Sequence, residues 1–240
     1  MTIAHLRPAG GFDPSGALAY HSNDRLSPDA AVRNAPPTFS TRERILGVAE
    51  TLFARHGFAG ASLRQVTAAA KVNLAAVNYH FGSKESLIEE VFRRRLDELN
   101  RQRLDALAAV LAKPGHVLED VLDAFIRPAL EHSMDRAGGA VFVRVLARAY
   151  AEHDERLRRF LSDNYGHVLR EFAAAFAPLL PQLDREELYW RLDIVSGALT
   201  YAMADFGMIK RRASTPEETH RERTAVHLVR FAAAGLRAPP

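Results

Sequence analysis

Apolar residues recur at intervals of three and four from about residue 40 onward, as they do on the buried face of a helix. Ile45, Ala49, Leu52 and Phe53 form the first such stripe, and no segment shows the alternation typical of a strand. The pattern therefore predicts an all-α fold. The later helices are expected near residues 84–111, 115–133, 138–152, 154–178, 184–210 and 216–237.

Capping residues indicate where the N-terminal helices begin. Ser40 with Glu43, and Ser62 with Gln65, have the spacing of a capping box, in which each side chain bonds to a free backbone amide of the other residue. Gly57 stands where a left-handed residue would end the first helix. The caps expected for the third and fourth helices are Asn73 and Ser83.

A helix-turn-helix is predicted because residues 70–72 alone separate a short helix over 62–69 from the next one. The second helix of such a motif enters the DNA major groove. Leu74 and Val77 are expected to face inward, which leaves small and polar side chains outside. Asn can read adenine, an Ala methyl can contact thymine, and cations and hydroxyls can reach phosphates. The predicted DNA contacts are Ser62, Arg64, Lys71, Asn73, Ala75, Ala76, Asn78, Tyr79, His80 and Lys84.

The series NYHFGSKESLIEEVF, which follows ERILGVAETLFARHGFAGASLRQVTAAAKVNLAAV, resembles the TetR family of bacterial transcriptional repressors over about residues 41–95. The resemblance implies a three-helix DNA-binding domain over residues 40–86 and a helical domain for effector binding and dimerisation over residues 87–240. The sequence departs from the family pattern at Lys71, where glycine is common, and at Ala61, where threonine is frequent. A left-handed backbone at Lys71 would cost roughly 1 kcal/mol.

Composition limits the classes of protein that fit. The chain is 48% hydrophobic and 25% charged, which is ordinary for a globular protein, and residues 1–39 are expected to form a disordered, Pro-rich extension. Because cysteine is absent and no histidine has metal-ligand spacing, no cofactor, metal or catalytic site is predicted. Residues 41–95 are mildly basic, with nine Lys/Arg and five Asp/Glu. No apolar run reaches the ~18 residues of a membrane span, and no signal peptide is recognised, so a cytoplasmic protein is expected.

The helices after residue 114 carry enough apolar and aromatic side chains to line a ligand pocket. VFVRVLARAYAEHDERLRRFLSDNYGHVLREFAAAF and LYWRLDIVSGALTYAM resemble the PsrA-type branch of the family, which implies a fatty acid or an acyl-CoA as the effector. An arginine can hold a carboxylate through two parallel hydrogen bonds. The candidate pocket residues are Phe125, Phe142, Arg144, Leu146, Arg148, Asn164, Tyr165, His167, Trp190 and Arg191.

The last two long helices carry apolar stripes that either close the core of one protomer or contact a second copy. In TetR-like proteins such helices form a four-helix interface, and a two-fold dimer suits an inverted-repeat operator. The predicted dimer interface consists of Leu188, Leu192, Val195, Leu199, Met203, Phe206, Val226, Val229 and Ala233.

The sequence thus favours a dimeric repressor that binds palindromic double-stranded operator DNA. A small apolar or amphipathic ligand is expected to release it from that DNA. When bound to DNA, the protein would be associated with the nucleoid. Two alternatives stay open. One is a DNA-binding regulator without a small-molecule effector, controlled by a protein partner; a fully packed helical core would favour it. The other is an all-helical enzyme or scaffold, for which the sequence shows no catalytic cluster.

Overall fold

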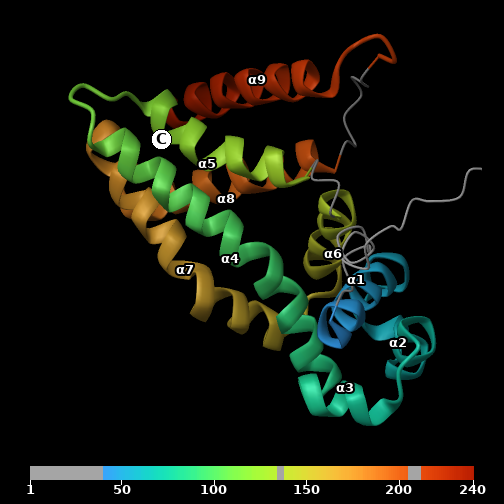
Figure 1. Cartoon of the computed structure of the whole chain (residues 1–240). Helices are drawn as coiled ribbons and strands as arrows, with labels where there is room; N and C mark the ends of the chain where they lie inside the picture. The colour runs from blue at the N-terminus through green and yellow to red at the C-terminus, as the bar shows by residue number, and fades with distance from the viewer. Residues whose placement is uncertain (1–39, 134–137, 205–211) are drawn as a thin grey trace, which may run out of the picture. The chain divides into compact units, whose positions relative to one another are not determined.

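The computed structural model describes residues 40–133, 138–204 and 212–240, and every regular element in these ranges is a helix (Figure 1). The all-α prediction is therefore confirmed. Within the same ranges no helix is both long and apolar enough to cross a membrane. The expected N-terminal extension lies outside the described residues. The helices are α1 (Thr41–Gly60), α2 (Leu63–Ala70), α3 (Leu74–Phe81), α4 (Lys84–Leu111), α5 (Leu118–Ser133), α6 (Gly139–Glu152), α7 (Glu155–Phe176), the 3-10 turn η3 (Ala177–Leu179), α8 (Arg185–Met203) and α9 (Glu217–Arg237).

The predicted caps begin the four N-terminal helices. At the start of α1 the Ser40 hydroxyl accepts the Glu43 N–H at 3.2 Å, and the Glu43 carboxylate accepts the Ser40 N–H at 3.0 Å. Ser62 and Gln65 form the same reciprocal pair at the start of α2. These bonds occupy amides that a helix end leaves without an internal partner. The caps of α3 and α4 are Asn73 and Ser83.

Two residues take the positive φ angles that the sequence indicated. Gly57 has φ 73° and ψ 175°, so regular α1 geometry breaks there, although one further helical turn continues to Gly60. Lys71 is in the left-handed region, with φ 53° and ψ 49°, and ends α2. The lysine therefore occupies a strained position that a glycine would take without a side-chain penalty.

Two clusters of buried apolar side chains form the interior. The first joins α1, α2, α3 and the start of α4 with α6 and the start of α7. The second joins the remainder of α4 with α5, α7, α8 and α9. Leu96 of α4 packs against both clusters. Helix α6 thus shares a core with the three N-terminal helices, although the boundary expected at residue 87 groups it with the C-terminal half.

Candidate nucleic-acid interface

Helices α2 and α3 are joined by three residues, Lys71, Val72 and Asn73. The Lys71 N–H donates to the Ala68 carbonyl at 3.3 Å, and the Val72 N–H donates to the Thr67 carbonyl at 3.1 Å, so the end of α2 fixes the turn. Val66 of α2 and Val77 of α3 are buried in the first cluster. The packing of these two side chains leaves the opposite side of α3 exposed.

The outward face of α3 consists of Ala75, Asn78 and Tyr79, and the Tyr79 side chain is 86% exposed. The prediction for Leu74 is wrong, because this side chain is 48% exposed rather than buried. At 100° per residue, Leu74 lies about 60° to one side of Val77, at the first position of the helix. It therefore borders the buried face without entering it. Ala76 and His80 are partly buried, and Asn73 is exposed.

Residues 61–84 contain three cations, Arg64, Lys71 and Lys84, and no Asp or Glu. None of the three forms an ion pair within the described ranges, and Arg64 and Lys71 are exposed. Ser62 is also exposed, with its hydroxyl held by the cap of α2. The predicted DNA contacts therefore lie on α2 and α3, at the residues that cap and join them, and at the first residue of α4, in a segment without carboxylates that would repel a polyanion.

The ten predicted pocket residues do not lie together. Phe125 belongs to the second apolar cluster, whereas Phe142, Leu146 and Tyr165 pack in the first. Burial, and a 2.7 Å hydrogen bond to Asp97, raise the pKa of Tyr165. These four side chains serve as core residues of two different clusters.

The polar members of that set are exposed or bonded to the protein. Arg191 donates to the carbonyls of Gly235 and Ala238 at the end of α9, at 2.9 and 2.6 Å. Arg148 donates to the Arg55 carbonyl at 3.3 Å. The remaining members, which are exposed, are Arg144, Asn164, His167 and Trp190.

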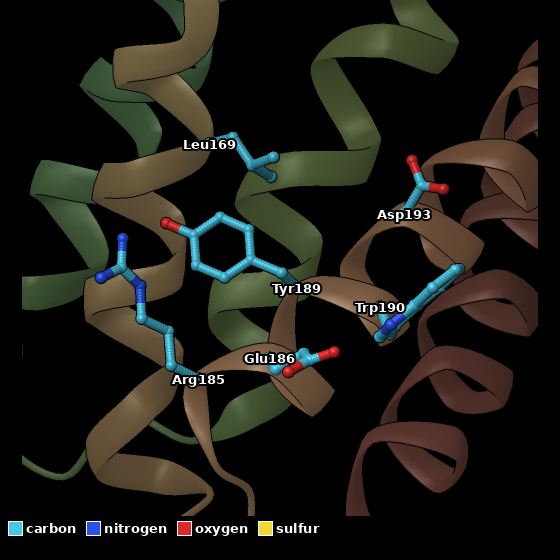
Figure 2. A pocket seen from close by; sticks show the side chains of 6 residues that line it. All are labelled: Leu169, Arg185, Glu186, Tyr189, Trp190 and Asp193. Atoms are coloured by element: carbon cyan, nitrogen blue, oxygen red, sulfur yellow. The ribbon is translucent and has the colours of Figure 1, made fainter.

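Trp190 instead lines an open groove of about 630 Å³ between α7 and α8 (Figure 2). The groove is also lined by Leu169, Arg185 and Tyr189, and the Arg185 guanidinium carbon lies 5.7 Å from the centre of the Tyr189 ring. Its acidic lining residues are Glu186 and Asp193. Of the ten predicted pocket residues, Trp190 is the one that contributes to this groove.

The residues predicted for the dimer interface lie mainly inside the protomer. Each of six is at most 8% exposed and belongs to the second cluster, so these residues present little surface to a second copy. These six are Leu188, Leu192, Val195, Leu199, Val229 and Ala233. Met203 and Val226 are partly buried, and Phe206 lies outside the described residues.

A second apolar stripe follows the opposite face of α8. Trp190, Ile194 and Tyr201 are 61%, 63% and 52% exposed, and they continue past Gly197 at steps of four, three and four. On α9, Phe231 is 70% exposed. Sequence periodicity alone does not decide which stripe of α8 is internal; packing against α5, α7 and α9 buries the leucine stripe.

The sequence matches two family models. Residues 45–91 match "Bacterial regulatory proteins, tetR family", and residues 123–235 match "Tetracyclin repressor-like, C-terminal domain". The first match contains α2, α3 and most of α1, and the second covers most of α5 to α9. Both halves of the chain therefore carry signals of the same family.

Individual relatives match over shorter segments. The repressor KstR2 of Rhodococcus jostii (strain RHA1) is 38% identical over 24% of this chain and 28% of its own length. The repressor NicS of Pseudomonas putida is 35% identical over 36% of this chain and 40% of its own length, so the matches span less than half of either relative. A TetR-family regulator from Bordetella parapertussis shares the fold, with a TM-score of 0.58, 18% identity and coverage of 78% of this chain and 93% of its own. The solved structure shares the fold, and the two family models show that the chain belongs to the TetR family of bacterial regulatory proteins.

Proposed function

We propose that this protein is a dimeric DNA-binding transcriptional repressor. The outward face of α3 carries the proposal, because Ala75, Asn78 and Tyr79 point away from the core in a segment with three cations and no carboxylate. Small side chains let a helix approach base edges, and positive charge attracts the phosphate backbone. KstR2 and NicS are both named as repressors, which supports repression as the direction of regulation.

Each residue of this surface has a role that fits its chemistry. The Asn78 amide can donate to and accept from one adenine edge, and the methyl groups of Ala75 and Ala76 can contact thymine. Tyr79, Arg64 and the other donors around α3 contact phosphates, which position the protein without reading sequence. These other donors are Ser62, Lys71, Asn73, His80 and Lys84. A protein with this role acts in the cytoplasm, on the nucleoid.

The dimer forms through the exposed stripes of α8 and α9 rather than through the buried ones. Trp190, Ile194, Tyr201 and Phe231 present large apolar side chains to solvent in the protomer. A patch of this kind on two neighbouring helices is typical of an interaction surface. The exposed Gly197 has no side chain to hold another helix away. A two-fold axis through this surface presents two copies of α3 to two half-sites.

We also propose that a small apolar ligand releases the protein from operator DNA. A fatty acid or an acyl-CoA is the first candidate for this ligand. A ligand shifts the protein away from the DNA-binding conformation only by as much as it prefers the other one. One observation favours the second candidate function, a regulator controlled by a protein partner. The expected pocket side chains pack in the apolar clusters, bond to protein groups or face solvent, instead of surrounding one cavity.

The DNA-binding function can be tested in two steps. Duplexes that bind the protein are first selected from a random DNA pool, and the affinity for the enriched sequence is then measured by fluorescence anisotropy. We expect an inverted repeat whose half-sites lie about one helical turn apart. Asn78→Ala is expected to cost about 1–3 kcal/mol at one position of each half-site and to relax specificity there. Asn164→Ala, at an exposed asparagine of α7, is the matched control. Enrichment of no inverted repeat would refute the proposed dimeric reading of DNA.

A further inference from the structure

Helix α4 turns two adjacent polar side chains toward the interior. Asn100 is only 8% exposed, and Arg103, three residues later on the same face, is partly buried. Leu99 and Leu107, on the same helix, belong to the second apolar cluster, and Leu96 packs against both clusters. The two polar groups therefore lie in a largely apolar environment, near the place where the clusters meet.

Arg103 differs from the other four arginines of α4 in its partners. Arg93, Arg94, Arg95 and Arg101 each form an ion pair with a glutamate. In the part of the chain that the structure describes, Arg103 has no carboxylate partner. Its Nε donates to the Phe125 carbonyl at 2.9 Å, and its guanidinium carbon lies 4.1 Å from the centre of the Phe125 ring. Burial lowers the pKa of Arg103 to about 10, and nearby Tyr150 partly offsets this effect, so the cation persists at neutral pH.

The Asn100 side chain is also without a partner. Its amide makes no hydrogen bond within the described ranges, although more than nine-tenths of the residue is buried. On α5, the buried Nε2 atom of His132 also has no hydrogen-bond partner among the residues that the structure describes. His132 follows Phe125 by seven residues and so lies on the same face of α5. Buried polar groups normally have partners, and a desolvated cation without a counter-ion is unfavourable, so a polar, anionic group would be favourable beside Arg103 and Asn100.

We propose that Arg103 and Asn100 anchor the carboxylate of an effector whose remaining atoms are apolar. The planar guanidinium offers two parallel N–H groups to a carboxylate, and the Asn100 amide supplies a further donor. The Phe125 ring, already stacked on Arg103, and the side chains of the two clusters contact the apolar body. This inference rests on the proposed ligand-controlled function and specifies its ligand as a free acid, because a thioester has lost its carboxylate.

The position of this anchor couples binding to the DNA-binding helices. Tyr150, whose electrostatic interaction shows it to be near Arg103, lies on α6. The α6 helix packs in one cluster with α1, α2 and α3, whereas Phe125 belongs to the cluster of α8 and α9. A ligand held by α4 and α5 beside α6 therefore acts on the junction between the two clusters. It changes DNA affinity if it favours one arrangement of that junction.

Isothermal titration calorimetry on the full chain, with defined probes, tests the ligand class. The acids are octanoate, laurate, palmitate and phenylacetate, each compared with its alcohol, and lauroyl-CoA represents the thioesters. We expect at least one acid to bind more tightly than its alcohol and, for laurate, more tightly than lauroyl-CoA. Arg103→Met is expected to weaken that acid by about 10- to 100-fold, the range for a hydrogen bond to a charged group, and to leave the alcohol unchanged.

Two further variants separate a lost contact from a lost fold. Arg101→Met removes an exposed arginine from the same helix and is expected to leave acid binding unchanged. Asn100→Asp gives Arg103 an acidic neighbour at spacing three, so the ligand-free protein should melt at a higher temperature while acid binding is lost. An increase in melting temperature excludes unfolding as the cause of that loss.

DNA affinity, measured on the same proteins, distinguishes the two proposals. Arg103→Met and Asn100→Asp are expected to bind operator DNA like the wild type when no acid is present. Three results would each overturn the carboxylate anchor. The first is equal acid affinity in wild type and Arg103→Met, and the second is tighter binding of lauroyl-CoA than of laurate. The third is that no acid binds at millimolar concentration. None of these results bears on DNA binding, which is measured separately. If the wild-type protein binds no operator DNA, the proposed function itself is refuted.

Discussion

The exposed Phe231 side chain provides the most direct test of the dimer surface. Phe231 is 70% exposed in the protomer. An aromatic side chain has roughly 200 Å² to bury, so covering the exposed part removes about 140 Å² from water. At roughly 25 cal/mol per Å² this is about 3.5 kcal/mol per copy, and about 7 kcal/mol for the two equivalent positions of a two-fold dimer. This value is an upper bound, since part of the gain offsets lost motional freedom.

Phe231→Glu replaces that contact with a charge facing its own symmetry mate. About 7 kcal/mol corresponds to roughly five orders of magnitude in the dimer dissociation constant, at about 1.4 kcal/mol per order. Sedimentation velocity over a dilution series measures this constant directly. We expect a wild-type dimer and a Phe231→Glu monomer at the same micromolar concentration. Leu74→Glu changes an exposed apolar residue of α3 and is expected to remain dimeric.

Ile194→Glu extends the test to α8, where the side chain is 63% exposed. It is expected to weaken the dimer as well, because a four-helix interface needs both helices. If both variants keep the wild-type melting temperature and still dimerise with the wild-type constant, the surface assigned here is wrong. A wild-type protein that stays monomeric at high concentration contradicts the dimer itself.

Three further outcomes follow from the N-terminal helices and the end of α9. Lys84→Ala is expected to flatten the dependence of log affinity on log salt concentration by about one unit, measured by anisotropy, and an unchanged slope removes Lys84 from the phosphate contacts. Gly57→Ala is expected to lower the free energy of unfolding by about 1–2 kcal/mol in urea, because a β-carbon at this positive φ would lie 2.1 Å from a carboxylate oxygen of Glu152; wild-type stability would show that Glu152 moves aside freely. The hydrogen bond from Arg237 lowers the pKa of Glu119, so its contribution to stability is present above the ordinary glutamate pKa and is lost as pH falls below it. Melting temperatures of wild type and Arg237→Met should therefore converge as the pH falls below the ordinary glutamate pKa, and a difference that persists in acid contradicts this assignment.

The local features of the DNA-binding half were predictable because their causes are local. A cap depends on a side chain and an amide within three residues, so Ser40, Ser62 and Asn73 could be assigned from the sequence alone. The left-handed turn at Lys71 was suggested by the family pattern, which commonly has glycine at this position. The exposure of Leu74 could not be predicted in the same way, because it depends on where α2 lies beside α3, and this placement is set by packing rather than by the sequence of α3.

The C-terminal half shows where periodicity stops being informative. An α-helix with apolar residues on two opposite sides fits equally well with either side inward, and α8 has Leu188, Leu192, Val195 and Leu199 on one side and Trp190, Ile194 and Tyr201 on the other. Helices α5, α7 and α9 pack against the first stripe, which leaves the second exposed. For a related reason, the sequence does not single out Arg103. Among five arginines on one helix, only the positions of the surrounding acids reveal which cation has been left without a carboxylate, and those positions are a property of the folded chain.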